Sequence, residues 1–319
     1  MKNILLVCRR GIGDMVWSVP LINSLHSAFP DAHIDIPATE TTSIYELITL
    51  FGDHVTPIPY PDSNHPFRKA EIKAHKAGDR LMKHTYHSKL LEEILPHDYD
   101  LAIFEKGNML NQAGEVVPYR INRISGKQIS TSDIREDTLP VDRYLQFATA
   151  AGIPARHDFS MGIDMERDAR LYDGTVLPDS NYVVLCLQAG QPEKKWTKEG
   201  FQTVIKHFQQ RGLDTILVGG PEEENLAREL PATKNTVTDH YSISLADFAR
   251  LAYRSEMVIS GDTGFMHLAD AVGAKVIGMF GPTPSAIFAP YHNTEYAVQA
   301  ESMEQLRPEQ VTTQIDRIL

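Results

Sequence analysis

The stretch Ser260–Leu268, with the sequence Ser-Gly-Asp-Thr-Gly-Phe-Met-His-Leu, joins a strand pattern to a helix pattern. The apolar residues Met257–Ile259 before it are typical of a buried strand end, and Phe265–Val272 has helical apolar spacing. The short turn between them places backbone N–H groups at a helix start, which suits a phosphate. Thr263 adds a hydroxyl that would cap the helix or contact the ligand. The alternative is an ordinary capped helix without a ligand, because a glycine-rich turn alone is weak support for a site.

Length and composition are those of a globular protein with two ordinary domains: 319 residues, 42% hydrophobic and 23% charged. The formal net charge of −11 argues against a general nucleic-acid binder, which needs a basic surface. No apolar run approaches the length of a membrane span, and the first apolar run ends too early for a signal peptide. Cys8 and Cys186 lie in strand patterns without metal-ligand spacing, so we expect buried thiols in a reducing cytoplasm.

Strand and helix patterns alternate along both halves of the chain. In the first half we expect strands at Ile4–Cys8, His33–Ile36, Val55–Pro59 and Asp100–Phe104, and helices at Met15–Phe29, Ser43–Phe51 and Arg80–Leu95. In the second half we expect strands at Tyr182–Leu187, Thr215–Val218, Met257–Ser260 and Lys275–Phe280, and helices at Thr197–Arg211, Glu222–Leu230, Leu245–Ala252 and Phe265–Val272. This alternation predicts an α/β fold, with parallel sheets covered by helices on both faces. We therefore expect two Rossmann-like, doubly wound domains facing a cleft, with ligands beyond the carboxyl ends of the strands.

A polar connection near Asp158–Ser180 separates the two halves. We expect an N-terminal domain at 1–165, a C-terminal domain at 166–300 and a C-terminal helix at 301–319. The last segment, Leu306–Leu319, has amphipathic helical spacing with Pro308 in its first turn. Since no strand follows this helix, we expect it to pack across the two domains.

The first turn, Cys8–Pro20, contains Gly11-x-Gly13 but has Val16 where the third glycine of a dinucleotide fingerprint would stand. A nicotinamide-dependent dehydrogenase is therefore disfavoured. Asp14 follows at the helix start, where its carboxylate would repel a dinucleotide diphosphate. It suits a base that takes a proton from a hydroxyl. The alternative is that Asp14 only caps the helix and complements its dipole.

Two further strand ends carry charged side chains. Lys194 and Lys195 follow the first strand of the second half, and they would neutralise a diphosphate leaving group. For Lys195, a solvated loop charge is the favoured interpretation. Glu222 and Glu223 open the next helix, where a carboxylate would accept a ribose hydroxyl or only complement the helix dipole.

Residues Pro66–Lys89 form a basic island in this acidic protein. Its basic residues recur at helical spacing and would line one face: Lys69, Lys73, Lys76, Arg80 and Lys83. The histidines among them do not make a convincing metal site. Such an island is either a solvated charged face or a surface for an anionic acceptor or an anionic membrane leaflet.

The turns together resemble glycosyltransferase family 9, the ADP-heptose:lipopolysaccharide heptosyltransferases. The motifs that carry the resemblance span almost the whole chain, in the order of that family: Gly13-Asp14 followed by Pro20, Glu193-Lys194-Lys195-Trp196, Gly219-Gly220-Pro221-Glu222, Ser260–Gly264 with His267-Leu268, and Phe280-Gly281-Pro282-Thr283. The resemblance implies a GT-B fold and an inverting sugar transfer that needs no metal and no other cofactor. It also implies that the first domain binds the acceptor and the second binds the nucleotide sugar.

The resemblance assigns expected roles to individual residues. Asp14 is the expected catalytic base, which deprotonates the acceptor hydroxyl. The expected donor-binding residues are Lys194, Glu222, Glu223, Asp262, Thr263, Gly264, Phe265 and His267, with one of the two glutamates on the ribose. The expected acceptor-binding residues are Arg9, Arg10, Gly13, Lys69, Lys73 and Arg80.

The chain departs from the family pattern in its loops. Ala189 and Gly190 stand where some heptosyltransferases carry hydroxyl side chains, and Gly281–Ser285 differs from the frequent Gly-Pro-Thr-Asp-Pro. Residues 60–130 resemble no particular heptosyltransferase. The leading hypothesis is transfer of heptose from ADP-heptose to a lipopolysaccharide core or a related surface glycan. The alternatives are transfer from another nucleotide sugar, or a catalytically silent paralogue that binds a nucleotide sugar or a partner protein.

The expected partners are a nucleotide sugar and an anionic glycan or glycolipid acceptor, and the charge of the chain bears on its location. We expect a cytoplasmic protein, with peripheral contact at the inner face of the inner membrane through Pro66–Lys89.

Overall fold

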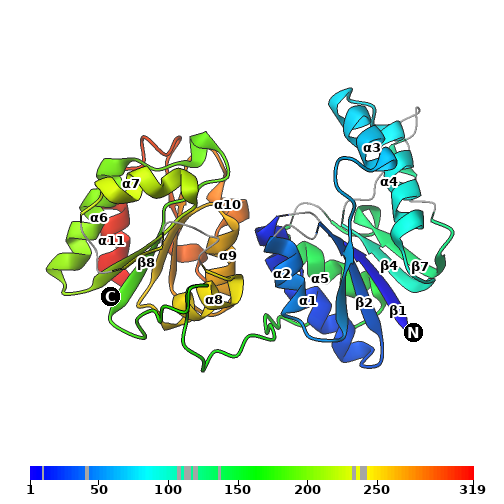
Figure 1. The fold of residues 1–319 in the computed structure, drawn as a ribbon, viewed down its shortest axis with the longest axis horizontal. Coiled ribbons are helices and arrows are strands. Elements are labelled where there is room, and N and C mark those ends of the chain that lie inside the picture. The colour runs from blue at the N-terminus through cyan, green and yellow to red at the C-terminus, as the bar shows by residue number, and fades with distance from the viewer. Residues whose placement is uncertain are drawn as a thin grey trace. The chain divides into compact units, whose positions relative to one another are not determined.

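The computed structural model describes all of the chain except residues 9–10, 40–42, 106–108, 111–115, 118–120, 136–137, 232–234 and 238–242. Two compact units make up the chain, Met1–Gly162 and Ile163–Leu319 (Figure 1). The boundary between the two units lies in the polar connection that separates the two alternating halves of the sequence.

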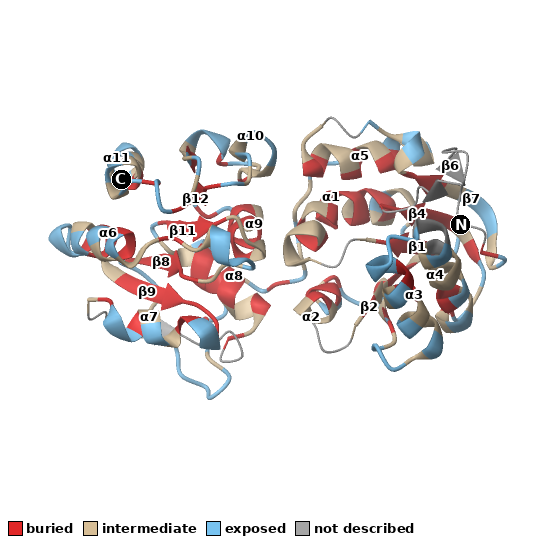
Figure 2. Cartoon of the chain, turned by 90° about the horizontal axis from the view of Figure 1, so that it is seen from above, coloured by how far each residue is buried: buried red, intermediate tan, exposed pale blue. Residues whose placement is uncertain are grey.

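A five-stranded parallel sheet in the order β3-β2-β1-β4-β7 forms the centre of the first unit. Its strands are β1 (Asn3–Val7), β2 (His33–Ala38), β3 (Val55–Pro59), β4 (Tyr99–Phe104) and β7 (Ile124–Ser130). Its helices are α1 (Ile12–Ala28), α2 (Ser43–Thr49), α3 (Pro66–Lys76), α4 (Arg80–Ile94) and α5 (Pro140–Ala151). Two further strands of two residues each, β5 (Met109–Leu110) and β6 (Val116–Val117), pair antiparallel and are separate from this sheet. Helices α1 and α5 pack together on one face, and α4 covers the opposite face (Figure 2).

A six-stranded parallel sheet in the order β10-β9-β8-β11-β12-β13 forms the centre of the second unit. Its strands are β8 (Tyr182–Cys186), β9 (Asp214–Val218), β10 (Asn235–Val237), β11 (Val258–Gly261), β12 (Val276–Phe280) and β13 (Val298–Gln299). Its helices are α6 (Lys198–Gln210), α7 (Glu224–Glu229), α8 (Leu245–Arg254), α9 (Gly264–Ala271), α10 (Ser285–Phe288) and α11 (Pro308–Ile318). This strand order is that of a doubly wound Rossmann sheet, in which the order reverses between β8 and β11.

The central strands owe their position to continuous apolar runs. Ile4–Leu6 and Tyr182–Leu185 are fully buried, as expected for parallel strands covered on both faces. These runs, and the helices between them, were the patterns expected from the sequence. The expected fold class, α/β with two Rossmann-like sheets, is confirmed.

The elements not expected from the sequence include β7, β10, β13 and α5. Strand β7 is polar, with the sequence Ile-Ser-Gly-Lys-Gln-Ile-Ser, and lies at a sheet edge. It lies beside β4 and approaches it so closely that a Cβ on Gly126 would lie 1.8 Å from the carbonyl oxygen of Asp100. Glycine at position 126 is therefore required by the approach of the two strands.

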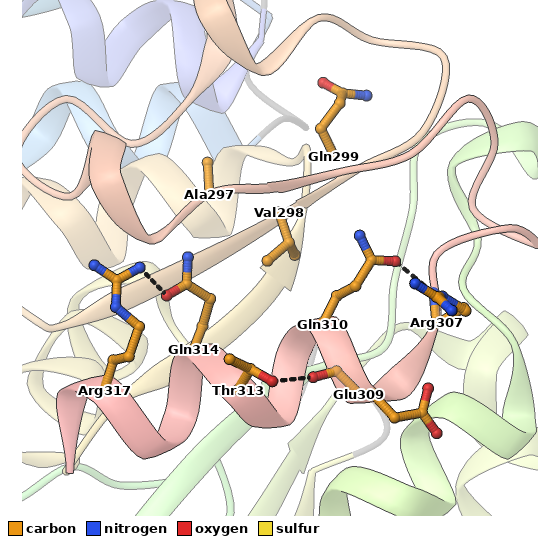
Figure 3. A pocket seen from close by; sticks show the side chains of 9 residues that line it. All are labelled: Ala297, Val298, Gln299, Arg307, Glu309, Gln310, Thr313, Gln314 and Arg317. Atoms are coloured by element: carbon orange, nitrogen blue, oxygen red, sulfur yellow. Dashed lines mark hydrogen bonds between the residues drawn. The ribbon is translucent and has the colours of Figure 1, made fainter.

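The C-terminal helix α11 packs on α6 and β12 inside the second unit, where Val311 and Ile315 are fully buried. The expected packing of this helix across both domains stays a prediction. A polar pocket of about 460 Å³ lies between α11 and the edge strand β13 (Figure 3). Its lining side chains, which include Arg307 and Arg317, are not among the expected site residues.

Candidate functional site

Three turns of the second unit follow adjacent strands at the carboxyl edge of the sheet. The short 3₁₀ turn Pro192–Lys194 follows β8, a second 3₁₀ turn, Pro221–Glu223, follows β9, and Asp262 and Thr263 join β11 to α9. Because β8 lies between β9 and β11, the three turns meet around the point where the strand order reverses. Ligands of doubly wound sheets bind at this point.

Lys194 and Asp262 are brought together across this point. The Nζ atom of Lys194 lies 2.6 Å from Oδ2 of Asp262, and both side chains are largely buried. The two residues are 68 positions apart in the sequence, and their meeting follows from the pairing of β8 with β11. The site therefore places one ammonium group and one carboxylate beside the start of α9.

The start of α9 offers backbone donors. Thr263 is its N-cap residue and has extended backbone angles, but its side chain makes no cap hydrogen bond. Its hydroxyl lies 3.2 Å from the hydroxyl of Ser260 instead. The Thr263 side chain therefore does not cap the helix. The backbone N–H groups of the first turn, from Gly264 and Phe265 onward, receive no hydrogen bond from that side chain. Such donors, together with the helix dipole, favour an anion.

Phe265 and His267 have side chains in the core. Phe265 is buried and packs edge-on against Phe248, with ring centroids 4.4 Å apart, so only its backbone faces the helix start. His267 is 4% exposed, and burial lowers its pKa to about 4. Its Nε2 atom lies 4.0 Å from Oδ1 of Asp262. The imidazole is therefore neutral at neutral pH and borders the carboxylate that holds Lys194.

Trp196 anchors the loop that carries the lysines. The indole is buried, donates a hydrogen bond from Nε1 to the carbonyl of Leu306 (2.9 Å), and packs edge-on against Phe201. Its ring lies so close to Gly200 that a Cβ there would be 2.5 Å from the ring. The tryptophan of the motif is thus a packing residue, and it fixes the position of Lys194 and Lys195.

Lys195, expected as a solvated loop charge, has a side chain that is 39% exposed and is also paired. Its Nζ atom lies 2.9 Å from Oε1 of Glu223 and 3.5 Å from Oε2 of Glu222. The hydrogen bond to Glu223 raises the pKa of Lys195. Glu223 is buried and Glu222 is 84% exposed, so the two candidate carboxylates differ in environment.

Asp14 is the third residue of α1, whose N-cap residue is Gly11. A Cβ on Gly11 would lie 2.7 Å from Oδ2 of Asp14, so the carboxylate lies against the chain that enters the helix. Gly13 is the second residue of the same helix. Asp14 therefore occupies the first turn after β1, at the carboxyl edge of the first sheet, where its charge also complements the helix dipole.

Glu105 is a second acidic residue at this edge, and sequence reasoning missed it. It follows β4 directly, is buried, and its backbone N–H donates to the carbonyl of Val7 at the end of β1 (3.0 Å). Burial and the charges of Glu105 and Asp14 raise the pKa of Cys8, so this thiol stays protonated. The sequence signal that could have identified Glu105 is its place directly after a buried strand. That strand, β4, pairs with β1, the strand that precedes Asp14.

The basic island forms the pair α3 and α4. Lys69 and Lys73 are exposed on α3. Glu71 lies beneath them, buried, and Arg68 contacts it at 2.5 Å. Although burial opposes its ionisation, the contacts of Glu71 with His87 and Arg68 lower its pKa to about 2. This acid therefore joins α3 to α4 through His87 and is paired with residues other than the exposed lysines.

The structure does not describe the side chains of three other expected acceptor residues. Arg9 and Arg10 lie outside the described residues, and only the backbone of Arg80, the first residue of α4, is described.

In the described part of the chain, no three His, Cys, Asp or Glu side chains form a group that would hold a metal ion. Among the described helices, none combines the length and apolar composition needed to cross a membrane.

Sequence comparisons relate the chain to one family and to several named proteins. A sequence profile of glycosyltransferase family 9 (heptosyltransferase) matches residues 120–316. Lipopolysaccharide heptosyltransferase 1 of Salmonella typhimurium is 28% identical over 307 residues, which cover 92% of this chain and 93% of that protein. Lipopolysaccharide heptosyltransferase 3 of Escherichia coli is 23% identical over 313 residues, which cover 88% and 84%.

Solved structures extend the comparison to the fold. E. coli heptosyltransferase WaaC with ADP matches with a TM-score of 0.71 at 19% identity, covering 99% of this chain and 100% of that one. E. coli ADP-heptose lps heptosyltransferase II matches with a TM-score of 0.67 at 16% identity, covering 100% and 98%. The expected GT-B fold is thereby confirmed. Since the family profile covers well over half of the sequence, the chain belongs to glycosyltransferase family 9, the heptosyltransferases.

Proposed function

We propose that this chain transfers a heptose from ADP-heptose to an acceptor hydroxyl of a lipopolysaccharide core or a related surface glycan, with inversion at the anomeric carbon. The observation that carries the proposal is the meeting of Lys194 with the start of α9 at the reversal point of the second sheet. The printed names of relatives support the choice of substrates, since they are lipopolysaccharide heptosyltransferases and one solved relative binds ADP-2-deoxy-2-fluoro heptose.

The donor diphosphate binds between Lys194 and the first turn of α9. The ammonium group exchanges Asp262 for phosphate oxygens, and the backbone N–H groups of Gly264 and Phe265 donate to the same group. As the diphosphate leaves, its growing negative charge is stabilised by donors that are already in place. In this scheme the protein's own cation and helix start neutralise the leaving group, so the transfer needs no metal ion.

The acceptor is activated by Asp14. Its carboxylate takes the proton of the acceptor hydroxyl while the hydroxyl oxygen forms a bond to the anomeric carbon. The bond from that carbon to the diphosphate oxygen breaks, and ADP leaves with the electron pair. Attack from the side opposite the leaving group inverts the configuration.

The exposed lysines of α3 contact an anionic acceptor, either a glycan or a glycolipid. Lys69 and Lys73 are exposed, and the acid beneath them, Glu71, is already paired. The same surface would bring the enzyme to the inner face of the inner membrane, because basic clusters are attracted to anionic lipid headgroups. Replacing Lys69 and Lys73 by Gln should raise the KM for the acceptor and lower recovery with anionic vesicles. The matched control is replacement of the exposed Lys206 and Lys275 of the second unit.

The deciding experiment measures binding and transfer separately. Isothermal titration with ADP, GDP and UDP identifies the nucleotide, and we expect ADP to bind at least about tenfold tighter than the other two. Transfer is followed with ADP-heptose and a heptose-free lipopolysaccharide core, with and without EDTA. ADP binding without any transfer would favour a silent paralogue, and preference for GDP or UDP would point to another nucleotide sugar. Loss of transfer in EDTA would contradict the metal-free scheme.

A further inference from the structure

Lys194 and Lys195 are neighbours in the sequence, yet each is bound to a different turn of the second sheet. Lys194 reaches Asp262, which follows β11, whereas Lys195 reaches Glu223, which follows β9. The loop after β8 is therefore tied to the turns on both of its sides. Since the diphosphate is proposed to bind on the side of Lys194, the side of Lys195 remains for the nucleoside end of the donor.

Glu223 is held at both of its carboxylate oxygens. Oε1 accepts from Nζ of Lys195 at 2.9 Å, and Oε2 accepts from the backbone N–H of Gly220 at 3.0 Å. Gly219 packs against it so closely that a Cβ there would lie 3.0 Å from Cβ of Glu223. The side chain of Glu223 is 6% exposed, so its position and its charge are both set by these contacts.

Glu222 lacks this environment. Its side chain is 84% exposed, and its nearest approach to Lys195 is 3.5 Å. An exposed glutamate loses side-chain entropy whenever it is fixed on a ligand, whereas a fixed carboxylate does not. Of the two adjacent glutamates, Glu223 is therefore the better acceptor for a pair of ligand hydroxyls.

We propose that Lys195 is a positioning residue: it fixes the carboxylate of Glu223 so that this carboxylate accepts hydrogen bonds from the ribose hydroxyls of a ribonucleoside diphosphate. This inference rests on the proposed function, because it takes the donor to be a nucleotide sugar. Each carboxylate oxygen has a second lone pair beyond the bond already made, which leaves capacity for a hydroxyl donor. A hydrogen bond of a sugar hydroxyl to a charged group contributes enough to discriminate against a ligand without that hydroxyl.

The experiment compares ADP with 2′,3′-dideoxy-ADP by isothermal titration. The wild-type protein should bind ADP at least about tenfold tighter than the dideoxy compound. In Lys195→Met that ratio should fall below about threefold, while Lys195→Arg should restore most of it. Glu223→Gln should lower the ratio as well, and a double variant with Lys195→Met should lose no more than either single variant. The matched control is Lys198→Met, because Lys198 lies three positions after Lys195, at the first residue of α6, and pairs with Glu229 at 2.7 Å instead of with Glu223.

The ratio separates positioning from the alternatives. If Lys195→Met weakens both ligands equally, Lys195 acts on the diphosphate and the inference is wrong. An unchanged ratio in Lys195→Met would mean that the ion pair only joins two turns, which also overturns it. Should Lys195→Met fail to fold by circular dichroism, the ratio in Lys195→Arg and Glu223→Gln decides the question.

Failure of the proposed function has a different signature. Wild-type protein that binds ADP without discriminating the dideoxy compound refutes the role of Glu223 and Lys195 and leaves the transferase proposal intact. Wild-type protein that binds none of ADP, GDP and UDP refutes the donor proposal itself, and the inference with it. If GDP or UDP binds instead of ADP, the ratio measured with that nucleotide and its dideoxy form supports or overturns the inference in the same way.

Discussion

Lys194 and Asp262 form an ion pair across two neighbouring strand ends, with Nζ 2.6 Å from Oδ2. A diphosphate that binds Lys194 must compete with Asp262 for the same ammonium group. The pair holds Lys194 at the reversal point of the sheet. Under the proposed function, donor binding therefore requires a rearrangement of Asp262, which borders the buried His267.

Replacing Lys194 by Met should lower kcat about 10²- to 10³-fold and weaken ADP binding about tenfold, because the leaving group loses its cation. Steady-state kinetics and calorimetry measure the two effects. Lys198→Met, which removes an ammonium paired with the exposed Glu229, is the control and should leave both values within about twofold. An unchanged kcat in Lys194→Met would contradict the role given to this residue.

Replacing Asp14 by Asn should lower kcat/KM about 10²- to 10⁴-fold, because the acceptor hydroxyl loses its base. ADP affinity should stay within about twofold. Loss of a first-turn carboxylate costs at most about 1 kcal/mol in the free energy of unfolding. Asp142→Asn is the matched stability control, since Asp142 lies in the first turn of α5. Normal turnover in Asp14→Asn would show that another group takes the proton.

Acid should destabilise the second unit through His267. Burial lowers its folded-state pKa to about 4 from an ordinary 6.5, so its contribution is fully present above pH 6.5 and is lost as the pH falls toward 4. Between pH 7 and pH 5 this should cost about 2 kcal/mol in the free energy of unfolding. Urea unfolding at both pH values measures it, and His267→Gln should reduce the difference.

His292 should behave with the opposite sign. Its hydrogen bond to Asp270 raises its pKa, so its stabilising contribution is fully present below pH 6.5 and is lost as the pH rises through the raised pKa. His292→Gln should therefore destabilise the protein more at pH 5 than at pH 8. An equal effect of both histidine variants at both pH values would contradict the assigned environments.

Replacing Gly126 by Ala should destabilise the first unit by at least about 2 kcal/mol, because the added Cβ would collide with the backbone of Asp100. Urea denaturation measures the loss. Gly190→Ala is the control, since an added Cβ there meets no atom within 4 Å, and its effect should stay below about 0.5 kcal/mol. A stable Gly126→Ala variant would show that β7 moves away from β4 without cost.

Apolar patterning was sufficient for most of the fold. The central strands and their covering helices were predictable because a parallel strand buried on both faces is a continuous apolar run. Strand β7 escaped prediction because it lies at an edge, where Ser125, Gly126 and Lys127 are tolerated. Short edge strands such as β13 carry too few residues for a pattern, and only their pairing partners define them.

The candidate site was predicted from residue types at strand ends and from a family motif. Lys194 and Asp14 were singled out because each follows a buried strand, whereas Asp262 was singled out because it lies in the motif that resembles glycosyltransferase family 9. Glu105 was missed because no motif surrounds it, and the pairing of Lys195 was not foreseen because Glu223 is 28 positions away in the sequence. The partner of a charged side chain is often distant in sequence, so local patterns do not reveal it.

The sequence by itself determined the fold class, the positions of the central strands and the residue types at their carboxyl ends, because hydrophobic periodicity and turn chemistry are local properties. Only the tertiary structure decided which charges meet. The order β9-β8-β11 places the turn after β8 between two others, so that Lys194 pairs with Asp262 on one side and Lys195 with Glu223 on the other. Such pairs depend on strand order and burial, which are set by the packing of the whole domain.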